Sequence, residues 1–312
     1  MPTIAPVKPD VVIPTWRARD LLAGCLSALR ADPSHKQLIV VDNASADGTA
    51  ELVRSEHPEV TLVELPENIG FGRAVNAGVR AGDGNAIVLL NNDVLVAPGF
   101  VDAIVAPFVS PDVGMVAGMT TIPDTDWVDA FGIELDRGLA AYNRGRRSRV
   151  GAPRGRLAMP SGGAAAYRRE AWEAAGGFDE ALFAYGEDVD LGLRLRSLGW
   201  EAAEAPEARG VHLGGASAGV DSPFQRELAG FARGFLLRRY GILRSRAAPR
   251  ALAVEVLVVG WGLARHRTLM PLTARARGWR AAGRDGRRAL PPGAVDPNIG
   301  VVESLRRLRT AR

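Results

Sequence analysis

Apolar residues in the first third of the chain follow two alternating patterns. Short continuous apolar runs, at residues 10–15 and 38–41, are typical of buried strands. Residues 19–31 instead carry leucines and a cysteine at helical spacing, which predicts an amphipathic helix. The two patterns keep alternating, with short connections, to about residue 110. This order predicts an α/β fold with a Rossmann-like open, mostly parallel sheet flanked by helices.

The pattern becomes irregular after residue 114 and later turns helical. Residues 115–165 mix glycine, proline and arginine, and we expect a strand-and-loop region there with an exposed, mobile basic loop. From residue 223 to about 288 apolar residues recur at helical spacing, with interruptions near Pro249 and Pro271. The expected organisation is a disordered segment (1–9), a main domain (10–220, with halves 10–114 and 115–220), a C-terminal amphipathic helical extension (221–290) and a loosely held tail (291–312).

The composition is that of an ordinary globular protein, because 47% of the residues are hydrophobic and 24% are charged. A single cysteine, Cys25, rules out an internal disulfide and fits a reducing compartment. The first ten residues lack the basic start and apolar core of a signal peptide. The longest apolar stretch, residues 251–264, is shorter than the about 20 residues that a membrane-spanning helix needs. These features predict a cytoplasmic protein.

Charge is distributed unevenly along the chain. Residues 226–312 contain nineteen arginines and five acidic residues, a balance of +14, whereas the whole chain carries +4. The remaining residues therefore carry −10. A basic segment on an acidic body predicts an anionic partner, either lipid headgroups or nucleic acid. The alternative is a helical face that is simply solvated.

Polar residues follow the predicted strands, at the edge where ligands bind to an open parallel sheet. One strand is expected over residues 86–96, and it contains a polar cluster of its own. The candidate side chains at the strand ends are Thr15, Arg17, Asp42, Asn43, Arg73, Asn92 and Asp93. Because the carboxyl ends of parallel strands meet at one edge, we expect these side chains to share one crevice.

Three short motifs each allow a functional and a structural interpretation. Asp93, in LLNNDV, offers the oxygen ligand that Mg²⁺ or Mn²⁺ prefers, or it forms an Asx turn. His212, in VHLGGAS, is a second metal ligand or a structural histidine, and without a Cys/His cluster a structural zinc site is not expected. Gly70 and Gly72 let the backbone approach a phosphate, or they only precede a helix. The chain has no P-loop.

Three acids stand together in GEDVD, residues 186–190. The helix dipole favours acids in a first helical turn, but a carboxylate can also take a proton from a substrate. Six segments occur in the order of one known family: VVIPTW, VVDNASADGT, NIGFGRAVNAG, LLNNDV, GGFDEALFAYGEDVDLGLRLRSLGW and HLGGAS. From about residue 11 to 217 the chain resembles the inverting, metal-dependent nucleotide-sugar glycosyltransferases of the GT-A fold. Its pattern is most similar to the family-2, rhamnosyltransferase-like enzymes that build bacterial surface polysaccharides.

The resemblance implies roles for individual residues. The implied nucleotide-binding positions are Thr15, Arg17, Asp42, Arg73 and Asn92. Asp93 and His212 are the implied ligands of the divalent cation, Mg²⁺ or Mn²⁺. Asp188 is the implied general base. The implied donor or acceptor sugar pocket contains Gly162, Gly163, Tyr185 and Glu187.

Two departures from the family pattern concern the same region. Asn91 occupies the position of the first acid of an Asp-x-Asp motif, which leaves Asp93 as the carboxylate ligand of that motif. The segment PTWR replaces the usual tyrosine–asparagine pair, so Trp16 and Arg17 are expected to alter how the base is held.

The implied reaction transfers a sugar, with inversion, from a nucleotide-diphosphate donor to a hydroxyl of a glycan or lipid-linked acceptor in cell-surface polysaccharide synthesis. The implied donor is dTDP-rhamnose, followed by a UDP-sugar. The alternative is a non-catalytic nucleotide-sugar-binding or scaffolding subunit at the membrane. A nucleotidyltransferase is disfavoured, because residues 14–20 lack a glycine- and lysine-rich loop.

The helical extension, residues 225–290, combines apolar stripes with arginine, which is typical of helices lying on anionic lipid. This composition predicts peripheral binding to the inner face of the plasma membrane. The alternatives are packing on the main domain or a homodimer interface. A nucleic-acid partner is not expected, because the sequence shows no stacking or groove-reading module.

Overall fold

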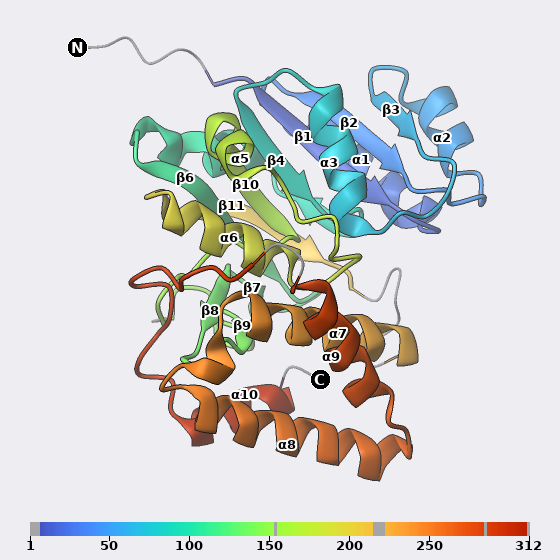
Figure 1. Cartoon of the computed structure of the whole chain (residues 1–312). Helices are drawn as coiled ribbons and strands as arrows, with labels where there is room; N and C mark the ends of the chain where they lie inside the picture. Colours follow the sequence, from blue (N-terminus) through green and yellow to red (C-terminus); the bar gives the residue numbers. More distant parts are fainter. Residues whose placement is uncertain (1–6, 153–154, 215–221, 284–285, 311–312) are drawn as a thin grey trace.

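The computed structural model describes residues 7–152, 155–214, 222–283 and 286–310 (Figure 1). Within these ranges a nine-stranded sheet has the order β3-β2-β1-β4-β10-β6-β11-β5, with β7 paired to β6, and β8 and β9 form a second sheet. The strands are β1 (Pro9–Thr15), β2 (Gln37–Asp42), β3 (Thr61–Glu64), β4 (Ala86–Leu90), β5 (Val94–Val96), β6 (Val113–Thr121), β7 (Val128–Ala130), β8 (Ile133–Leu135), β9 (Ala141–Asn143), β10 (Ala164–Arg168) and β11 (Glu201–His212).

Six strands of the large sheet run in one direction, and β5, β7 and β10 run in the other. The sheet is therefore mixed but mostly parallel, which confirms the predicted α/β class. Side chains alternate along β1: Val11 and Ile13 pack into the core on one face, and Val12 packs into the core on the other. The apolar runs are continuous because helices cover both faces.

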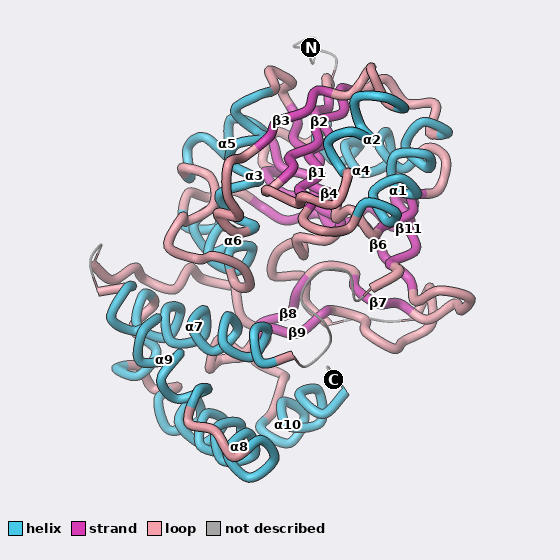
Figure 2. Tube along the Cα trace, turned by 90° about the vertical axis from the view of Figure 1, so that its right-hand side faces the viewer, coloured by secondary structure: helices cyan, strands magenta, loops and turns pink. Residues whose placement is uncertain are grey.

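The helices form three groups (Figures 1 and 2). Helices α1, α2 and α4 supply the core on one face of the sheet, α3, α5 and α6 supply it on the other, and α7 to α10 form a layer beyond the sheet. Their bounds are α1 (Arg19–Ala31), α2 (Thr49–Glu56), α3 (Phe71–Ala81), α4 (Phe100–Val105), α5 (Arg169–Ala175), α6 (Glu187–Ser197), α7 (Pro223–Arg239), α8 (Ala248–His266), α9 (Met270–Ala281) and α10 (Val301–Thr310). In the described ranges, none of these helices combines the length and apolarity needed to cross a bilayer.

The strand expected over residues 86–96 is divided in two, and this division shapes the site. The chain turns after Leu90, where the Val94 N–H donates to the Asn91 carbonyl (3.2 Å). Asn and Asp side chains favour such turns. β5 then pairs antiparallel with β11, so that Val94 lies opposite His212. This pairing brings Asp93 beside His212.

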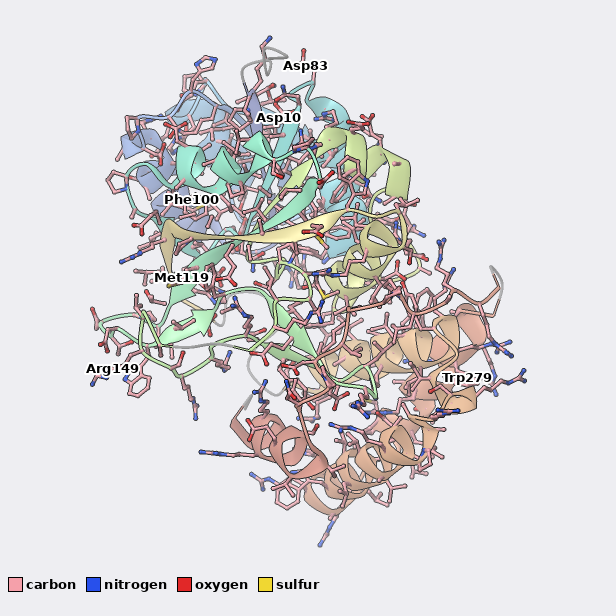
Figure 3. The ribbon with its side chains drawn as sticks, turned by 90° about the vertical axis from the view of Figure 1, so that its left-hand side faces the viewer. Asp10, Asp83, Phe100, Met119, Arg149 and Trp279 are labelled. Atoms are coloured by element: carbon pink, nitrogen blue, oxygen red, sulfur yellow. The ribbon has the colours of Figure 1, made fainter. Side chains whose placement is uncertain are left out.

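The basic segment at residues 142–156 is held more firmly than expected. Arg144 is buried, and its guanidinium lies 2.6 Å from the Glu204 carboxylate and donates to the Gly155 carbonyl (2.6 Å). These acceptors compensate for the loss of water around the charge. Arg149 is exposed and projects from the edge of the molecule in Figure 3. The expectation of an exposed, mobile loop is therefore corrected at Arg144, and residues 153–154 lie outside the described ranges.

The helical extension is interrupted near Pro249 and Pro271, as expected: each proline lies in the first turn of a new helix, α8 or α9, where it removes no helical hydrogen bond.

Both ends of the chain are more ordered than the sequence predicts. The last twenty residues contain α10 rather than only a loose tail, because Ser304 is buried and its hydroxyl donates to Asp136 Oδ2 (2.7 Å). At the other end β1 begins at Pro9, and residues 1–6 lie outside the described ranges.

Candidate active site

A cavity of about 480 Å³ lies at the carboxyl ends of β1 and β4. This is the edge at which an open parallel sheet binds ligands. Nine of the twelve residues to which the family resemblance assigns roles line the cavity: Thr15, Asn92, Asp93, Gly162, Gly163, Tyr185, Glu187, Asp188 and His212. Arg17, Asp42 and Arg73 are not among the lining residues.

The ends of β1 and β2 form one part of the cavity rim. Thr15 and Asp42 are direct neighbours in the parallel register, and Asn92 Nδ2 donates to Thr15 Oγ1 (2.8 Å). Asp42 is buried, and its carboxylate accepts the Ser45 N–H (3.1 Å). Arg17 is exposed, and its own N–H donates to Ser45 Oγ (3.0 Å). Asp42 and Arg17 therefore adjoin the cavity through their chain neighbours without lining it.

Arg73 does not line the cavity, although it was expected to bind the nucleotide. It lies in the first turn of α3, and its Nε donates to the Glu180 carbonyl (3.1 Å). Its side chain is 48% exposed. Phe71 lines the cavity instead. Because a helix has 3.6 residues per turn, residues two positions apart point to nearly opposite sides.

The glycines before α3 serve close packing rather than an open phosphate loop. Gly70 has a φ of +90°, and a Cβ there would lie 2.5 Å from the Phe183 carbonyl oxygen. The Phe71 N–H donates to that same carbonyl (2.6 Å). A Cβ on Gly72 would lie 3.3 Å from the Leu182 carbonyl oxygen. The glycines thus let the segment that leads into α6 lie directly against α3.

The acids of GEDVD begin α6. The two preceding residues, Tyr185 and Gly186, have φ values of +67° and +82°. A left-handed tyrosine is strained, and such strain clusters at functional sites. This turn directs Glu187 and Asp188 into the cavity lining, and Asp188 Oδ2 accepts the Gly162 N–H (3.2 Å). Asp190 is used differently, because it is buried in an ion pair with Arg194 (2.7 Å).

Burial changes the proton affinity of this acidic pair. Burial raises the pKa of Asp188 above its ordinary value, although hydrogen bonds from backbone N–H groups oppose the shift. Burial, and then the negative charge of Asp188, raise the pKa of Glu187 to about 8. Two adjacent carboxylates in a dry site do not ionise together. With a pKa of about 8, Glu187 therefore keeps its proton at neutral pH beside Asp188.

Asp93 and His212 form a second acidic cluster with a partner that sequence reasoning missed. His212 Nε2 lies 3.3 Å from Asp93 Oδ1, and His212 Nδ1 lies 2.8 Å from Asp129 Oδ2. Asp129 lies on β7 and also contacts Arg146 (3.0 Å). No motif surrounds Asp129 in the sequence, and its neighbours Val128 and Ala130 on β7 give no local sign of a binding role.

The charges in this cluster support one another. The hydrogen bond to Asp129 and the neighbouring Asp93 carboxylate raise the pKa of His212 to about 10. Burial alone would raise the pKa of Asp129, but the bond to His212 and the positive charges of His212 and Arg146 hold it below the ordinary value. The cluster is therefore built to hold positive charge between two carboxylates.

The extension contributes part of the wall. Phe224, Gln225 and Leu228 of α7 line the cavity together with residues of the main domain. Phe224 also packs edge-on against the ring of Phe183 (6.3 Å between centroids). These three residues carry no sequence signal of a binding role, because they resemble any amphipathic helix start. Residues 215–221, which include Ala216 and Ser217 of HLGGAS, lie outside the described ranges.

Comparison with protein families identifies the scaffold. Residues 8–234 match a protein family that is described as "Glycosyltransferase like family 2". The matched segment includes the whole large sheet and the cavity-lining part of α7. The chain belongs to this family. It is a glycosyltransferase of the GT-A fold, as the six sequence segments predict.

Named relatives of this glycosyltransferase act in bacterial glycan synthesis. The N-acetylglucosaminyl-diphospho-decaprenol L-rhamnosyltransferase of Mycobacterium tuberculosis is 32% identical over 213 residues, which cover 59% of this chain and 68% of the relative. An O-antigen biosynthesis protein of Myxococcus xanthus is 26% identical over 233 residues, 69% of this chain but 18% of that protein.

Solved structures share the fold. A mannosyltransferase from Pyrobaculum calidifontis, in complex with GDP-Man and Mn²⁺, has a TM-score of 0.56 and 23% identity, covering 92% of this chain and 78% of that chain. GalNAc-T7 with UDP, GalNAc and Mn²⁺ has a TM-score of 0.60 and 14% identity, covering 89% and 56%.

The Asp93 cluster of this glycosyltransferase has the chemistry of a partial cation site. Asp93 Oδ1 is buried without a hydrogen-bond partner, and the Nδ1–Asp129 bond leaves His212 Nε2 directed at it. A carboxylate behind an imidazole is the usual support of a ligating histidine. In the described residues, no group of three or more His, Cys, Asp or Glu side chains could hold a metal ion. The residues fit a cation whose shell is completed by substrate oxygens.

Proposed function

We propose that this glycosyltransferase moves a sugar, with inversion, from a nucleotide-diphosphate donor to an acceptor hydroxyl. One observation carries the proposal: the Asp93–His212 pair and the half-buried Asp188 line the same cavity of about 480 Å³ at the ends of the parallel strands. A family 2 glycosyltransferase with these two groups in one cavity has a place for the diphosphate and a place for the proton that leaves the acceptor.

The donor nucleotide binds at the ends of β1 and β2. The Thr15 hydroxyl, which accepts a hydrogen bond from Asn92, presents a hydrogen-bonding group to a pyrimidine base, and Asp42 supports this part of the rim from the neighbouring strand. Asp93 and His212 would hold the divalent cation, Mg²⁺ or Mn²⁺. When bound, the cation stabilises the negative charge of the departing diphosphate.

The acceptor hydroxyl attacks the anomeric carbon from the side of α6. The Asp188 carboxylate takes the hydroxyl proton as the new bond forms, and the bond to the diphosphate oxygen breaks. Gly162 N–H orients the Asp188 carboxylate through a hydrogen bond (3.2 Å). Glu187, protonated beside it, leaves Asp188 as the proton acceptor. A single displacement inverts the configuration of the anomeric carbon.

The substrates follow from the named relatives. We assign dTDP-rhamnose as the first donor to test and a UDP-sugar as the second, because the Mycobacterium tuberculosis relative is named as an L-rhamnosyltransferase. That relative's acceptor, as its name states, is attached to a diphospho-decaprenol lipid. A glycan or lipid-linked acceptor in cell-surface polysaccharide synthesis puts the reaction at the inner face of the plasma membrane.

The test is a donor panel on the purified full-length protein. Melting temperature is measured with dTDP, UDP, GDP and CDP, with and without Mn²⁺ or Mg²⁺. Transfer from the matching nucleotide sugar to a synthetic N-acetylglucosaminyl-diphospho-lipid is then followed by mass spectrometry. The expected result is metal-dependent stabilisation by one pyrimidine diphosphate and a product with inverted anomeric configuration.

Two outcomes would contradict the proposal. A folded protein that no nucleotide stabilises would favour the non-catalytic scaffold. A product with retained configuration would exclude the single displacement and the role of Asp188 in it.

A further inference from the structure

Helix α8 exposes an apolar surface that the cavity does not use. Its inward residues, Ala251, Val254 and Gly262, are buried. Its outward side carries large apolar residues that are 45–69% exposed: Leu252, Val256, Leu257, Trp261 and Leu263. We call these five side chains the α8 face. Leu269 and Leu272, at the start of α9, are also exposed.

The α8 face is unusual for a helix in contact with water. Between residues 251 and 264 the single charged side chain is Glu255, which lies 2.6 Å from both Arg233 and Arg275 of the neighbouring helices. The outward half of the helix therefore carries no charge over this length. A helix that is apolar on all sides is normally buried, and a contiguous exposed apolar patch marks a contact surface.

The position of α8 leaves this face open. Figures 1 and 2 both show α8 as the outermost helix of the extension, with α7 and α9 between it and the sheet. Figure 3 places Trp279 of α9 far from Phe100 of α4, which packs on the sheet. A surface on α8 can therefore contact a large, flat partner while the cavity stays accessible beside α7.

Arginines stand at both ends of the α8 face. Arg244 and Arg246 precede the helix, and Arg265 and Arg267 lie at its end. All four are exposed, and none has an ion-pair partner within the described residues. An apolar stripe between basic ends matches the boundary between acyl chains and anionic headgroups.

We infer that the α8 face lies along the surface of an anionic bilayer, with its apolar side chains at the acyl boundary and the four arginines at lipid phosphates. A second copy of the chain fits less well, because two α8 faces packed together would bring arginine clusters together without acids between them. Membrane binding through the α8 face would hold the enzyme where a lipid-linked acceptor lies, and this purpose rests on the proposed function.

The experiment is vesicle flotation of the full-length protein without donor or acceptor. Vesicles of phosphatidylcholine with and without phosphatidylglycerol are compared, at low and high salt. We expect binding to the anionic vesicles that salt weakens, since screening reduces the attraction to lipid phosphates. The variant Val256→Glu/Trp261→Glu should bind about tenfold or more weakly, because it removes two apolar anchors and adds two negative charges.

The matched control is Val109→Glu/Leu198→Glu. These residues are as exposed as the pair on α8, but they lie outside the extension. The control should bind vesicles as the unmodified protein does. A second variant, Arg265→Gln/Arg267→Gln, should lose the preference for phosphatidylglycerol. Equal melting temperatures of all variants confirm that each is folded.

Three results would overturn the inference: no vesicle binding by the unmodified protein, equal loss in the α8 variant and the control, or equal binding with and without phosphatidylglycerol. A dimer in light scattering that only the α8 variant dissociates, without vesicle binding, would assign the face to a second copy. Nucleotide stabilisation in the same samples separates the two proposals, since a protein that binds nucleotide but no vesicles refutes only this one.

Discussion

Two acidic groups line the same cavity but have opposite surroundings. Asp93 and Asp129 lie on either side of the His212 imidazole, and positive charge lowers the pKa of Asp129. Glu187 is buried and the adjacent Asp188 is half-buried, and the loss of water raises the pKa of both. The same chemical group thus has its charged form stabilised at one place and its protonated form stabilised at the other.

The difference shows how one fold separates two tasks. The first group is assembled by strand pairing, because β5 and β11 align Asp93 with His212 and β7 adds Asp129. The second group depends on a strained turn and a helix start. When two acids in one site have environments that move their pKa values apart, the difference indicates which acid holds a proton and which stays charged. Each prediction below changes one of these environments.

The largest effect is expected from Asp188→Asn. Asparagine keeps the size of the side chain and can still accept the Gly162 N–H, but it cannot take a proton. We expect kcat to fall by about 10²- to 10⁴-fold, with donor affinity unchanged. Steady-state kinetics and calorimetric titration of the donor nucleotide measure the two quantities.

Glu187→Gln is the control for that experiment, because it changes the adjacent acid without removing the proposed base. Its kcat at neutral pH should stay close to that of the unmodified enzyme. If Glu187→Gln lost as much activity as Asp188→Asn, the two acids would act as one unit and the assignment of the base to Asp188 would be wrong.

The next largest effect is expected from Asp93→Asn and from chelation of divalent cations. Both remove the site that stabilises the diphosphate, so kcat/KM should fall by roughly 10²- to 10³-fold. In contrast to Asp188→Asn, donor affinity should fall as well. Metal-dependent thermal stabilisation by the nucleotide is the direct readout. An Asp93→Asn protein that keeps this stabilisation would show that the cation does not bind here.

A smaller effect is expected from Asp129→Asn, which tests whether the partner behind His212 matters. The amide no longer carries the charge that fixes the His212 ring, so Mn²⁺ affinity should fall by about 10- to 100-fold. Calorimetric titration of Mn²⁺ in the presence of nucleotide measures this. Asp126→Asn is the matched control, because Asp126 precedes the same strand and is paired with the exposed Arg149. Equal Mn²⁺ affinities in the two variants would remove Asp129 from the site.

The sequence was sufficient to predict the sheet and the edge where the site lies. Alternating strand and helix patterns locate β1, β2 and β4, and strand ends supply Thr15, Asn92 and Asp93 because parallel strands end at one edge. Asp188 came from family-like motifs rather than from periodicity. These features are local, so a single sequence carries them.

What the sequence did not show depends on contacts between distant segments. Asp129 joins the site only through the pairing of β7 with β6, which no local pattern specifies. The direction of Arg73 depends on the segment that packs against α3 and supplies the Glu180 carbonyl. Arg144 is buried because Glu204 of β11 receives it. In each case the chemistry is visible in the sequence but the partner is not.

The smallest effect is expected on the free energy of unfolding, which can be measured without any substrate. Glu187 has a pKa of about 8 in the folded protein, against an ordinary value of 4.5. Between these values the folded state holds a proton that the unfolded state has lost, so the contribution of Glu187 to stability falls as pH rises through this window. Glu187→Gln should therefore flatten the fall in unfolding free energy between pH 5 and pH 8. Denaturant unfolding at several pH values measures this, with the exposed Glu173→Gln as control. If Glu187→Gln and the unmodified protein gave parallel curves of unfolding free energy against pH, water would reach Glu187 in the cavity. Burial would then not raise the pKa of Glu187.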